Sequence, residues 1–304
     1  MRKKSLDCIY ELAKQDPRVV YIGSDVGAET LEQFRQEMPD RFFMEGISEA
    51  HIIGMAAGLA KAGYIPYVNT IATFLTRRCY EQITIDVCLQ NLPVKLIANG
   101  GGLVYAPLGP THMAVDDIGL MRLLPNMNII APCDANEMEN WMMQTTAISG
   151  PVYVRVAKGD EPTISLNKNN LWKKPGEALI ITTGVMPHQA LKAIDLLEEQ
   201  GISCGLLHLP IVKPIDRDLI LTHIKSVSLV ITLEEHLKAG GLGSSVLEIV
   251  SDLHYINTPK MLRLGLPDHF VELYGSQQEL FQHYGLDAKG ISQKILRCLN
   301  PITS

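Results

Sequence analysis

One junction between a strand and a helix decides the fold class of this sequence: Phe43-Met44-Glu45-Gly46-Ile47-Ser48-Glu49-Ala50-His51. The pattern predicts a short strand over Arg41–Met44 and a helix over Ser48–Lys61, with the Ser48 side chain capping the helix. Glu49 then lies in the first helical turn, beside the carboxyl end of a strand, where ligands bind in open α/β sheets. From the pattern alone, the simpler interpretation is that Glu49 complements the helix dipole.

Short apolar runs continue to alternate with longer amphipathic stretches on both sides of this junction. The runs predict strands at Val19–Gly23, Ile65–Val68, Val94–Ala98, Ile129–Ala131 and Val152–Val156. The amphipathic stretches predict helices at Arg78–Gln90, Ala114–Arg122 and Asn136–Ala147. This alternation predicts an α/β fold, with a mainly parallel sheet covered by helices on both faces.

The periodicity is lost over residues 159–176, which we interpret as a linker. Beyond it, strands are predicted at Ala178–Thr182, Ile202–Leu209, Leu229–Leu233 and Met261–Leu264. Helices are predicted at His188–Gln200, Arg217–Lys225, Ser244–Leu253, Gln277–His283 and Ser292–Leu299. The sequence therefore predicts a first domain over residues 1–158 and a smaller α/β domain over residues 177–304.

Composition narrows the class of protein. The 304 residues are 46% hydrophobic and 20% charged, which suits two folded domains and argues against disorder. A net charge of -6 argues against nucleic-acid binding. No apolar run is long enough to span a bilayer, so we expect no membrane partner and a cytoplasmic location. The six cysteines match no zinc pattern, so no metal-ligating residues are expected in this chain.

Three further stretches contain residues that suit ligand binding. Thr73–Tyr80 offers two aromatic rings and two arginines, which suit stacking on a heterocycle and phosphate recognition. Gly100–His112 is a long, glycine-rich segment that ends in a histidine, and Leu233–Ser245 joins a strand to a helix through glycines. Each also has a plainer interpretation: a core aromatic with solvated arginines, a surface turn, and a tight strand-to-helix connection.

Taken together and in order, these stretches resemble the C-terminal two-thirds of transketolases and 1-deoxyxylulose-5-phosphate synthases over nearly the whole chain. Gly-Ile-Ser-Glu49 resembles the catalytic-glutamate segment, Thr73-Phe74-Leu75 the segment that stacks on the aminopyrimidine, and Gly109-Pro110-Thr111-His112 the substrate-histidine loop. Glu234-Glu235-His236 and Pro267-Asp268-His269-Phe270 resemble the C-terminal domain. The resemblance implies a thiamine-diphosphate-binding fold, in which a pyrimidine-binding domain precedes a transketolase C-terminal domain.

The resemblance also implies which residues form the site. Glu49 would pair with a ring nitrogen of the aminopyrimidine, and His112 would hydrogen-bond the substrate; we predict both as catalytic residues. Phe74 would stack on the aminopyrimidine. Tyr80 and Asp25 are further residues predicted at the cofactor. Arg77 and Arg155 are predicted to bind the substrate phosphate.

A motif that the family needs is missing from this sequence. Transketolases hold the diphosphate and Mg²⁺ through Gly-Asp-Gly followed downstream by Asn, and Gly159-Asp160-Glu161 does not match. The resemblance therefore implies the C-terminal subunit of a split transketolase, which uses thiamine diphosphate and Mg²⁺ together with a separate diphosphate-binding subunit. An assembly of two plus two subunits and a sugar phosphate substrate are expected.

Several alternatives stay open at this point. Leu108 stands where both families carry an aspartate before Gly-Pro-Thr-His, so the sugar preference is undecided. Arg77 and His51 follow the synthase branch, which keeps a synthase-like carboligase in view. The beta subunit of a 2-oxo-acid dehydrogenase has a similar layout. The last alternative, a regulatory half without catalysis, is disfavoured because Glu49, Phe74 and His112 are all present.

Overall fold

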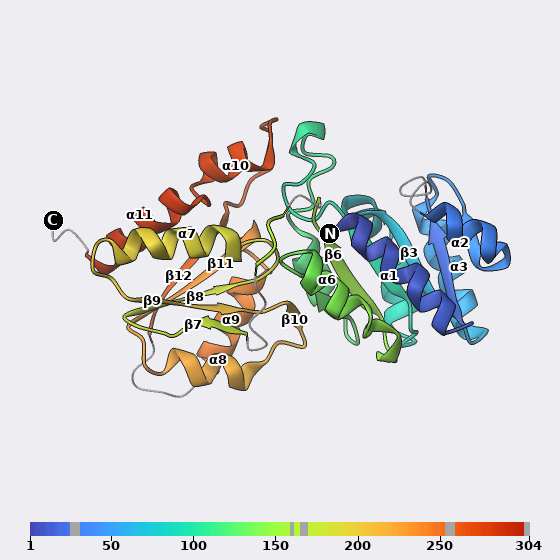
Figure 1. Cartoon of the computed structure of the whole chain (residues 1–304), viewed down its shortest axis with the longest axis horizontal. Coiled ribbons are helices and arrows are strands. Elements are labelled where there is room, and N and C mark those ends of the chain that lie inside the picture. The colour runs from blue at the N-terminus through green and yellow to red at the C-terminus, as the bar shows by residue number, and fades with distance from the viewer. Residues whose placement is uncertain (25–30, 159–160, 165–169, 253–258, 301–304) are drawn as a thin grey trace.

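The computed structural model describes residues 1–24, 31–158, 161–164, 170–252 and 259–300, which form two α/β units, each built on one sheet (Figure 1). The strands of the first sheet are β1 Val19–Gly23, β2 Phe42–Met44, β3 Ile65–Ile71, β4 Lys95–Asn99, β5 Asn128–Ile130, β6 Val152–Val156 and β10 Ile211–Lys213. They lie in the order β10-β5-β6-β4-β3-β1-β2. Neighbours are parallel except β10, which runs antiparallel to β5. The predicted α/β fold class is confirmed.

Helices cover both faces of the first sheet because its central strands are apolar on both sides. Every residue of β1, β4 and β6 is buried. One face packs against α1 Arg2–Gln15, α2 Glu32–Glu37 and α6 Ala135–Met142. The other face packs against α3 Glu49–Lys61, α5 Asp117–Arg122 and the helical stretch that begins at Phe74. Short 3-10 turns lie at Pro39–Arg41, Ala106–Leu108 and Thr145–Ala147.

The second sheet is smaller. Its strands are β7 Leu171–Lys173, β8 Ala178–Thr182, β9 Cys204–His208, β11 Leu229–Leu237 and β12 Lys260–Leu266, in the order β12-β11-β8-β9-β7. One face packs against α7 Pro187–Glu198, α10 Gln277–Tyr284 and α11 Ala288–Leu299, and the other against α8 Arg217–Ile224 and α9 Leu242–Ser251 (Figure 1). In the described part of the chain, no helix combines the length and the apolarity that a membrane crossing requires.

Four elements were not predicted from the sequence. Helices α1 and α2 lie in stretches for which no helix was proposed, although α1 buries a clear apolar face formed by Leu6, Ile9 and Leu12. Strand β7 lies inside the predicted linker and pairs with the edge of the second sheet. Strand β10 follows the second unit's β9 and yet pairs with β5 of the first sheet. Such short strands carry too little periodicity to be recognised from sequence.

The predicted helix over Arg78–Gln90 differs in its form. The structure has a wide π-helical turn, η3, at Phe74–Arg78, then one turn of α-helix, α4, at Tyr80–Gln82, then a second π-helical segment, η4, at Ile83–Cys88. Wide turns of this kind accumulate at functional sites because they redirect side chains within a continuous helix. Here the first of them presents Arg77 and Arg78 to different partners.

Candidate active site

Glu49 is the first residue of α3 and is 1% exposed. Its Oε2 atom accepts a hydrogen bond from Nη1 of Arg78 at 2.5 Å. The predicted helix cap is wrong, because the Ser48 hydroxyl donates to the carbonyl of Glu45 and accepts nothing from α3. Helix α3 thus begins with the buried carboxylate of Glu49, and the guanidinium of Arg78 compensates the charge of this carboxylate.

Phe74 and His112 extend this site. The Arg78 guanidinium lies over the Phe74 ring, with its Cζ 4.5 Å from the ring centroid. The His112 ring meets Phe74 edge-on, with centroids 5.2 Å apart and planes at 69°. Glu49, Phe74 and His112 follow β2, β3 and β4, so the carboxyl ends of one parallel sheet bring together three side chains that are distant in sequence.

Arg78 was missed as a functional residue at the sequence level. It stands four residues after Phe74, and helical residues spaced in this way share a face. This spacing was the available signal, but the predicted helix began at Arg78 and therefore left Phe74 outside it. In the structure both residues belong to η3, and Arg78 reaches across Phe74 to Glu49.

Arg77 faces a different place. Its Nε and Nη2 atoms donate to the Asp116 carboxylate at 3.0 and 2.8 Å, and Nη2 also donates to the carbonyl of Met113. Arg77 and Asp116 line a cavity of about 790 Å³ between the two units. The second unit contributes His269, Phe270, His283 and Tyr284 to its wall. The predicted phosphate-binding arginine therefore lies at a cavity, paired with a carboxylate that a ligand would have to replace.

Tyr80 and Asp25 are the two remaining residues predicted at the cofactor. The half-buried Tyr80 donates a hydrogen bond from its hydroxyl to the carbonyl of Leu120 at 3.3 Å, which joins α4 to α5. Asp25 lies outside the described residues. The hydrogen bond of Tyr80 does not involve Glu49 or Phe74.

Arg155, the second arginine predicted at the substrate phosphate, is buried and extensively hydrogen-bonded. Its side chain is 6% exposed, and Nε and Nη2 donate to Oδ2 and Oδ1 of Asp117 at 2.8 and 2.9 Å. Nη2 also donates to the carbonyls of Ala114 and Glu235. Arg155 therefore connects the first sheet, α5 and the second unit in this structure. Its predicted role at a substrate phosphate stays a prediction.

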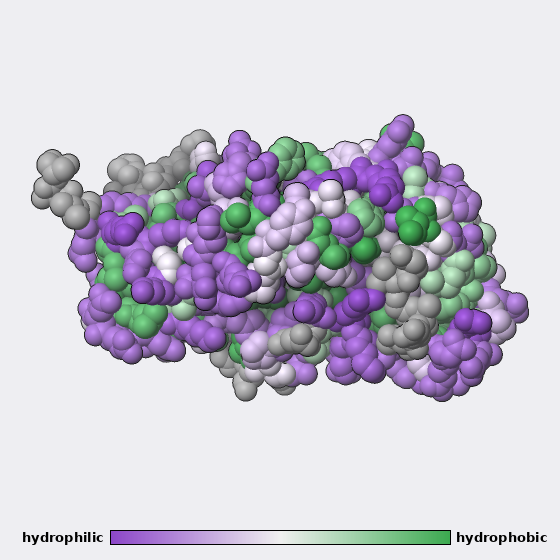
Figure 2. All heavy atoms as spheres, turned by 90° about the horizontal axis from the view of Figure 1, so that it is seen from above, coloured by the Kyte–Doolittle hydropathy of each residue, from purple (hydrophilic) through white to green (hydrophobic). Residues whose placement is uncertain are grey.

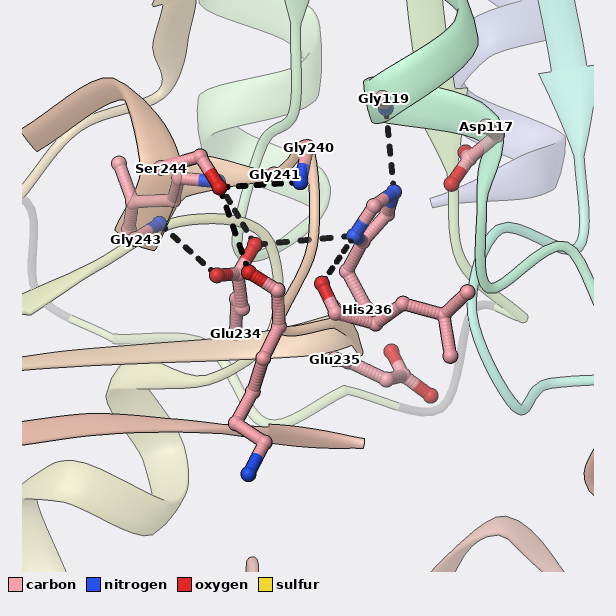
Figure 3. A network of polar contacts seen from close by, with 12 residues as sticks. Asp117, Gly119, Glu234, Glu235, His236, Gly240, Gly241, Gly243 and Ser244 are labelled. Atoms are coloured by element: carbon pink, nitrogen blue, oxygen red, sulfur yellow. Dashed lines mark hydrogen bonds and ion pairs between the residues drawn. The ribbon is translucent and has the colours of Figure 1, made fainter. Parts of the chain in front are cut away.

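The motif Glu234-Glu235-His236 at the end of β11 joins the two units (Figure 3). Glu234 accepts hydrogen bonds from the N–H groups of Leu242 and Gly243, so it closes the amino end of α9. His236 accepts through Nε2 from the N–H of Gly119 in α5 at 3.1 Å, and its Nδ1 lies 2.6 Å from its neighbour's carbonyl oxygen. These partners assign the ring proton to Nδ1.

Glu235 reaches into the glycine-rich loop after β4. Its Oε1 accepts from the N–H of Leu103 at 2.7 Å and from Nε2 of Gln277 at 2.7 Å. Gly102 packs directly against this carboxyl at a φ of +72°, so a larger residue there would meet both a clash and an unfavourable backbone. The second unit thereby fixes the base of the loop that carries His112. From the sequence alone, this motif was interpreted as a plain strand-to-helix connection.

Burial raises the pKa of Glu235 to about 7 from its ordinary value of 4.5. The folded chain therefore keeps this proton up to near pH 7, whereas the unfolded chain releases it near pH 4.5. The protonated Glu235 therefore contributes about 3 kcal/mol to the unfolding free energy. This contribution is fully present below pH 4.5 and is lost as the pH rises through 7.

The variant Glu235→Gln keeps a neutral side chain at every pH. We expect the difference in unfolding free energy between variant and wild type to shift by about this amount in favour of the variant between pH 4.5 and 7.5, as measured by denaturant unfolding. A pH-independent difference would contradict it.

Cys133, Glu137 and His208 are a buried group among the described residues whose side-chain atoms lie within 4.8 Å of one another, as a metal site would need. They already satisfy one another, since Oε2 of Glu137 accepts from the N–H of Cys133 at 2.7 Å and lies 3.0 Å from Nε2 of His208. Burial would raise the pKa of Glu137, but His208 brings it below its ordinary value. Through the contact between Glu137 and His208, the group connects α6 to β9 across the two units.

Comparison with known proteins gives a consistent result. The family described as transketolase, pyrimidine binding domain, matches residues 1–162, and the transketolase C-terminal domain matches residues 169–291. A 1-deoxy-D-xylulose-5-phosphate synthase of Syntrophotalea carbinolica is 37% identical over 294 residues, which are 93% of this chain and 46% of the synthase. The chain thus spans about half the length of such synthases.

Two further proteins match over nearly their whole length. One subunit of the apulose-4-phosphate transketolase of Phocaeicola vulgatus is 34% identical over 304 residues, with 97% of this chain and 96% of that subunit covered. A solved structure of a split-gene transketolase, described as an inactive beta4 tetramer, superposes with a TM-score of 0.86 at 31% identity, covering 98% of this chain and 97% of that one.

Proposed function

Because this chain belongs to the transketolase family, we propose that it is the C-terminal subunit of a thiamine-diphosphate-dependent transketolase. The enzyme moves a two-carbon ketol unit between sugar phosphates in carbohydrate metabolism and is active with a separate diphosphate-binding subunit. The observation that carries this proposal is the convergence of Glu49, Phe74 and His112 at the carboxyl ends of one parallel sheet.

The described residues fit the aminopyrimidine ring of thiamine diphosphate. Glu49 already accepts a hydrogen bond from a planar, cationic N–H group, and Phe74 already stacks on that same group. A protonated aminopyrimidine is also a planar N–H donor, so this pair suits it. Glu49 and Phe74 would hold the ring, and we propose Tyr80 and Asp25 as further residues of the cofactor site.

Thiamine diphosphate supplies, when bound, the nucleophile that breaks and re-forms a carbon–carbon bond beside a ketose carbonyl. This chain contributes orientation, charge and hydrogen bonds. Glu49 holds a negative charge in a buried position, where charge acts most strongly on a bound N–H group. We propose that His112 hydrogen-bonds a substrate oxygen and that Arg77 receives a phosphate. The contact of His112 with Phe74 and the position of Arg77 in the cavity wall support these roles.

We propose that a partner subunit holds the diphosphate and Mg²⁺, because this chain matches one subunit of a transketolase over 96% of that subunit's length. The surface near the cavity supports such a partner. Leu108, Phe270 and Tyr274 are 53%, 82% and 68% exposed, and Tyr274 packs against Gly109 of the histidine loop. Figure 2 shows hydrophobic patches among hydrophilic ones on the face seen from above. Exposed apolar surface of this kind marks protein interaction sites, and we propose an assembly of two plus two subunits.

The proposal predicts that neither chain is active alone. The partner is sought as the product of an adjacent reading frame, and both chains are purified separately and together. We expect transfer from a ketose phosphate to an aldose phosphate only in the mixture, in the presence of thiamine diphosphate and Mg²⁺, and co-elution of the two chains at the mass of two plus two. Full turnover by this chain alone would contradict the proposal.

A second candidate is a carboligase of the 1-deoxyxylulose-5-phosphate synthase kind. The 37% identity with such a synthase favours it, and so do Arg77 and His51, which follow the synthase branch. The same two-chain preparation decides, with a 2-oxo acid supplied in place of the ketose donor. Release of CO₂ with formation of a new ketose phosphate would favour the carboligase. Release of CO₂ with transfer to a lipoyl domain would favour the 2-oxo-acid dehydrogenase that the sequence also left open.

A further inference from the structure

Arg78 makes two contacts that together describe a ligand. Its Nη1 donates to Oε2 of Glu49 at 2.5 Å, and its guanidinium lies over Phe74 with Cζ 4.5 Å from the ring centroid. Guanidinium is planar and delocalised, so it can stack on an aromatic face and donate a hydrogen bond in its own plane at the same time. One side chain thus satisfies both a buried carboxylate and an aromatic face.

The neighbouring arginine shows that this placement is specific. Arg77 directs its guanidinium to Asp116 and to the carbonyl of Met113, away from Glu49 and Phe74. The π-helical turn η3 separates the two guanidinium groups although the residues are adjacent in sequence. Arg78 lies over Phe74 because it follows that residue by four positions on a helix.

The Arg78 side chain is also free to leave. It is 47% exposed, whereas Glu49 is 1% exposed. Among the described residues, Glu49 and Phe74 are the partners that hold its guanidinium through a hydrogen bond and a ring contact. A long, solvated side chain of this kind can rotate outward without opening a cavity.

We propose that Arg78 occupies the aminopyrimidine subsite of this chain and is displaced when thiamine diphosphate binds. The inference rests on the proposed function, which places the aminopyrimidine between Glu49 and Phe74. Arg78 and the ring need the same carboxylate oxygen and the same aromatic face, so they exclude each other. Arg78 therefore competes with the cofactor and, until the cofactor arrives, keeps the buried charge of Glu49 compensated.

Competition by Arg78 predicts the direction in which the dissociation constant of the cofactor changes. A cofactor that binds only the fraction of molecules whose subsite is open shows an apparent dissociation constant raised by the inverse of that fraction. Removing the competing side chain removes this factor. Arg78→Ala should therefore tighten binding, whereas removing an arginine that contacts the cofactor would weaken it.

The test is a calorimetric titration of cofactor-free two-chain enzyme with thiamine diphosphate at fixed Mg²⁺. We expect Arg78→Ala to lower the dissociation constant by about tenfold, and Arg78→Lys, which keeps the charge but not the planar face, to lower it less. Arg77→Ala is the matched control and should produce no tightening. An unchanged or raised dissociation constant for Arg78→Ala overturns the inference.

A second measurement separates this inference from the proposed function. In the isolated chain, Glu49→Gln, Arg78→Ala and the double variant form a cycle whose unfolding free energies should be non-additive, because each single change breaks the same contact. Additive effects would contradict the contact itself. If no assembly binds thiamine diphosphate while the cycle remains non-additive, the proposed function fails, and the contact between Arg78 and Glu49 is then a structural ion pair only.

Discussion

Replacing Glu49 by Gln in the two-chain enzyme is expected to lower turnover by about 10³-fold, in the range by which a positioned acid or base accelerates a reaction. The amide has nearly the same size as the carboxylate and can still accept a hydrogen bond at its carbonyl oxygen. It carries no negative charge and takes up no proton. The substitution therefore tests the charge of Glu49 at a position that is 1% exposed, where no solvent compensates for its loss.

The measurement is steady-state turnover, with cofactor binding and assembly mass recorded on the same preparations. Glu11→Gln is the matched control, because Glu11 is exposed on α1, on the opposite face of the sheet from α3. It should leave turnover within about twofold, as is usual for surface substitutions. If Glu49→Gln retains near-normal turnover in an intact assembly, Glu49 has no catalytic role and its position reflects the helix terminus alone.

The sequence predicted correctly those features that depend on a local pattern of residues. The strands Val19–Gly23, Val152–Val156 and Ala178–Thr182 have the predicted bounds, because buried parallel strands are continuous apolar runs between turns. The junction at Glu49 was informative for the same reason. A strand followed by a helix places its connecting residues at the carboxyl edge of the sheet, whatever the rest of the chain does.

The contacts between distant segments could not be derived in this way. Nothing in the sequence near Arg78 indicates that its partner is Glu49, 29 positions earlier. Likewise, the spacing around Arg155 does not indicate that its partner is Asp117 on α5. Only the packing of that helix against β6 determines this pairing. The sequence pattern is least informative about buried charges, because the tertiary structure determines their partners.

Asp117 gives the second large effect. Its carboxylate is fully buried, accepts from Nε and Nη2 of Arg155, and accepts at Oδ2 from the Tyr153 hydroxyl at 2.7 Å. Asp117→Asn keeps the shape but leaves the guanidinium of Arg155 without this counter-charge in the interior. Breaking a buried pair in this way costs about 3–5 kcal/mol. We expect that loss in the unfolding free energy of the isolated chain, measured by denaturant titration.

The adjacent residue supplies the control. Asp116 also binds an arginine through both oxygens, but its pair with Arg77 is about a third exposed, with side-chain exposures of 31% and 37%. Solvent screens such a pair, so Asp116→Asn should cost less than about 1 kcal/mol. Adding Arg155→Met to Asp117→Asn should restore part of the loss, because the double variant buries no unpaired charge at this position. Equal losses for the two asparagine variants would show that burial does not set the strength of these pairs, and the role of Arg155 as a buried connection between the units would then have to be abandoned.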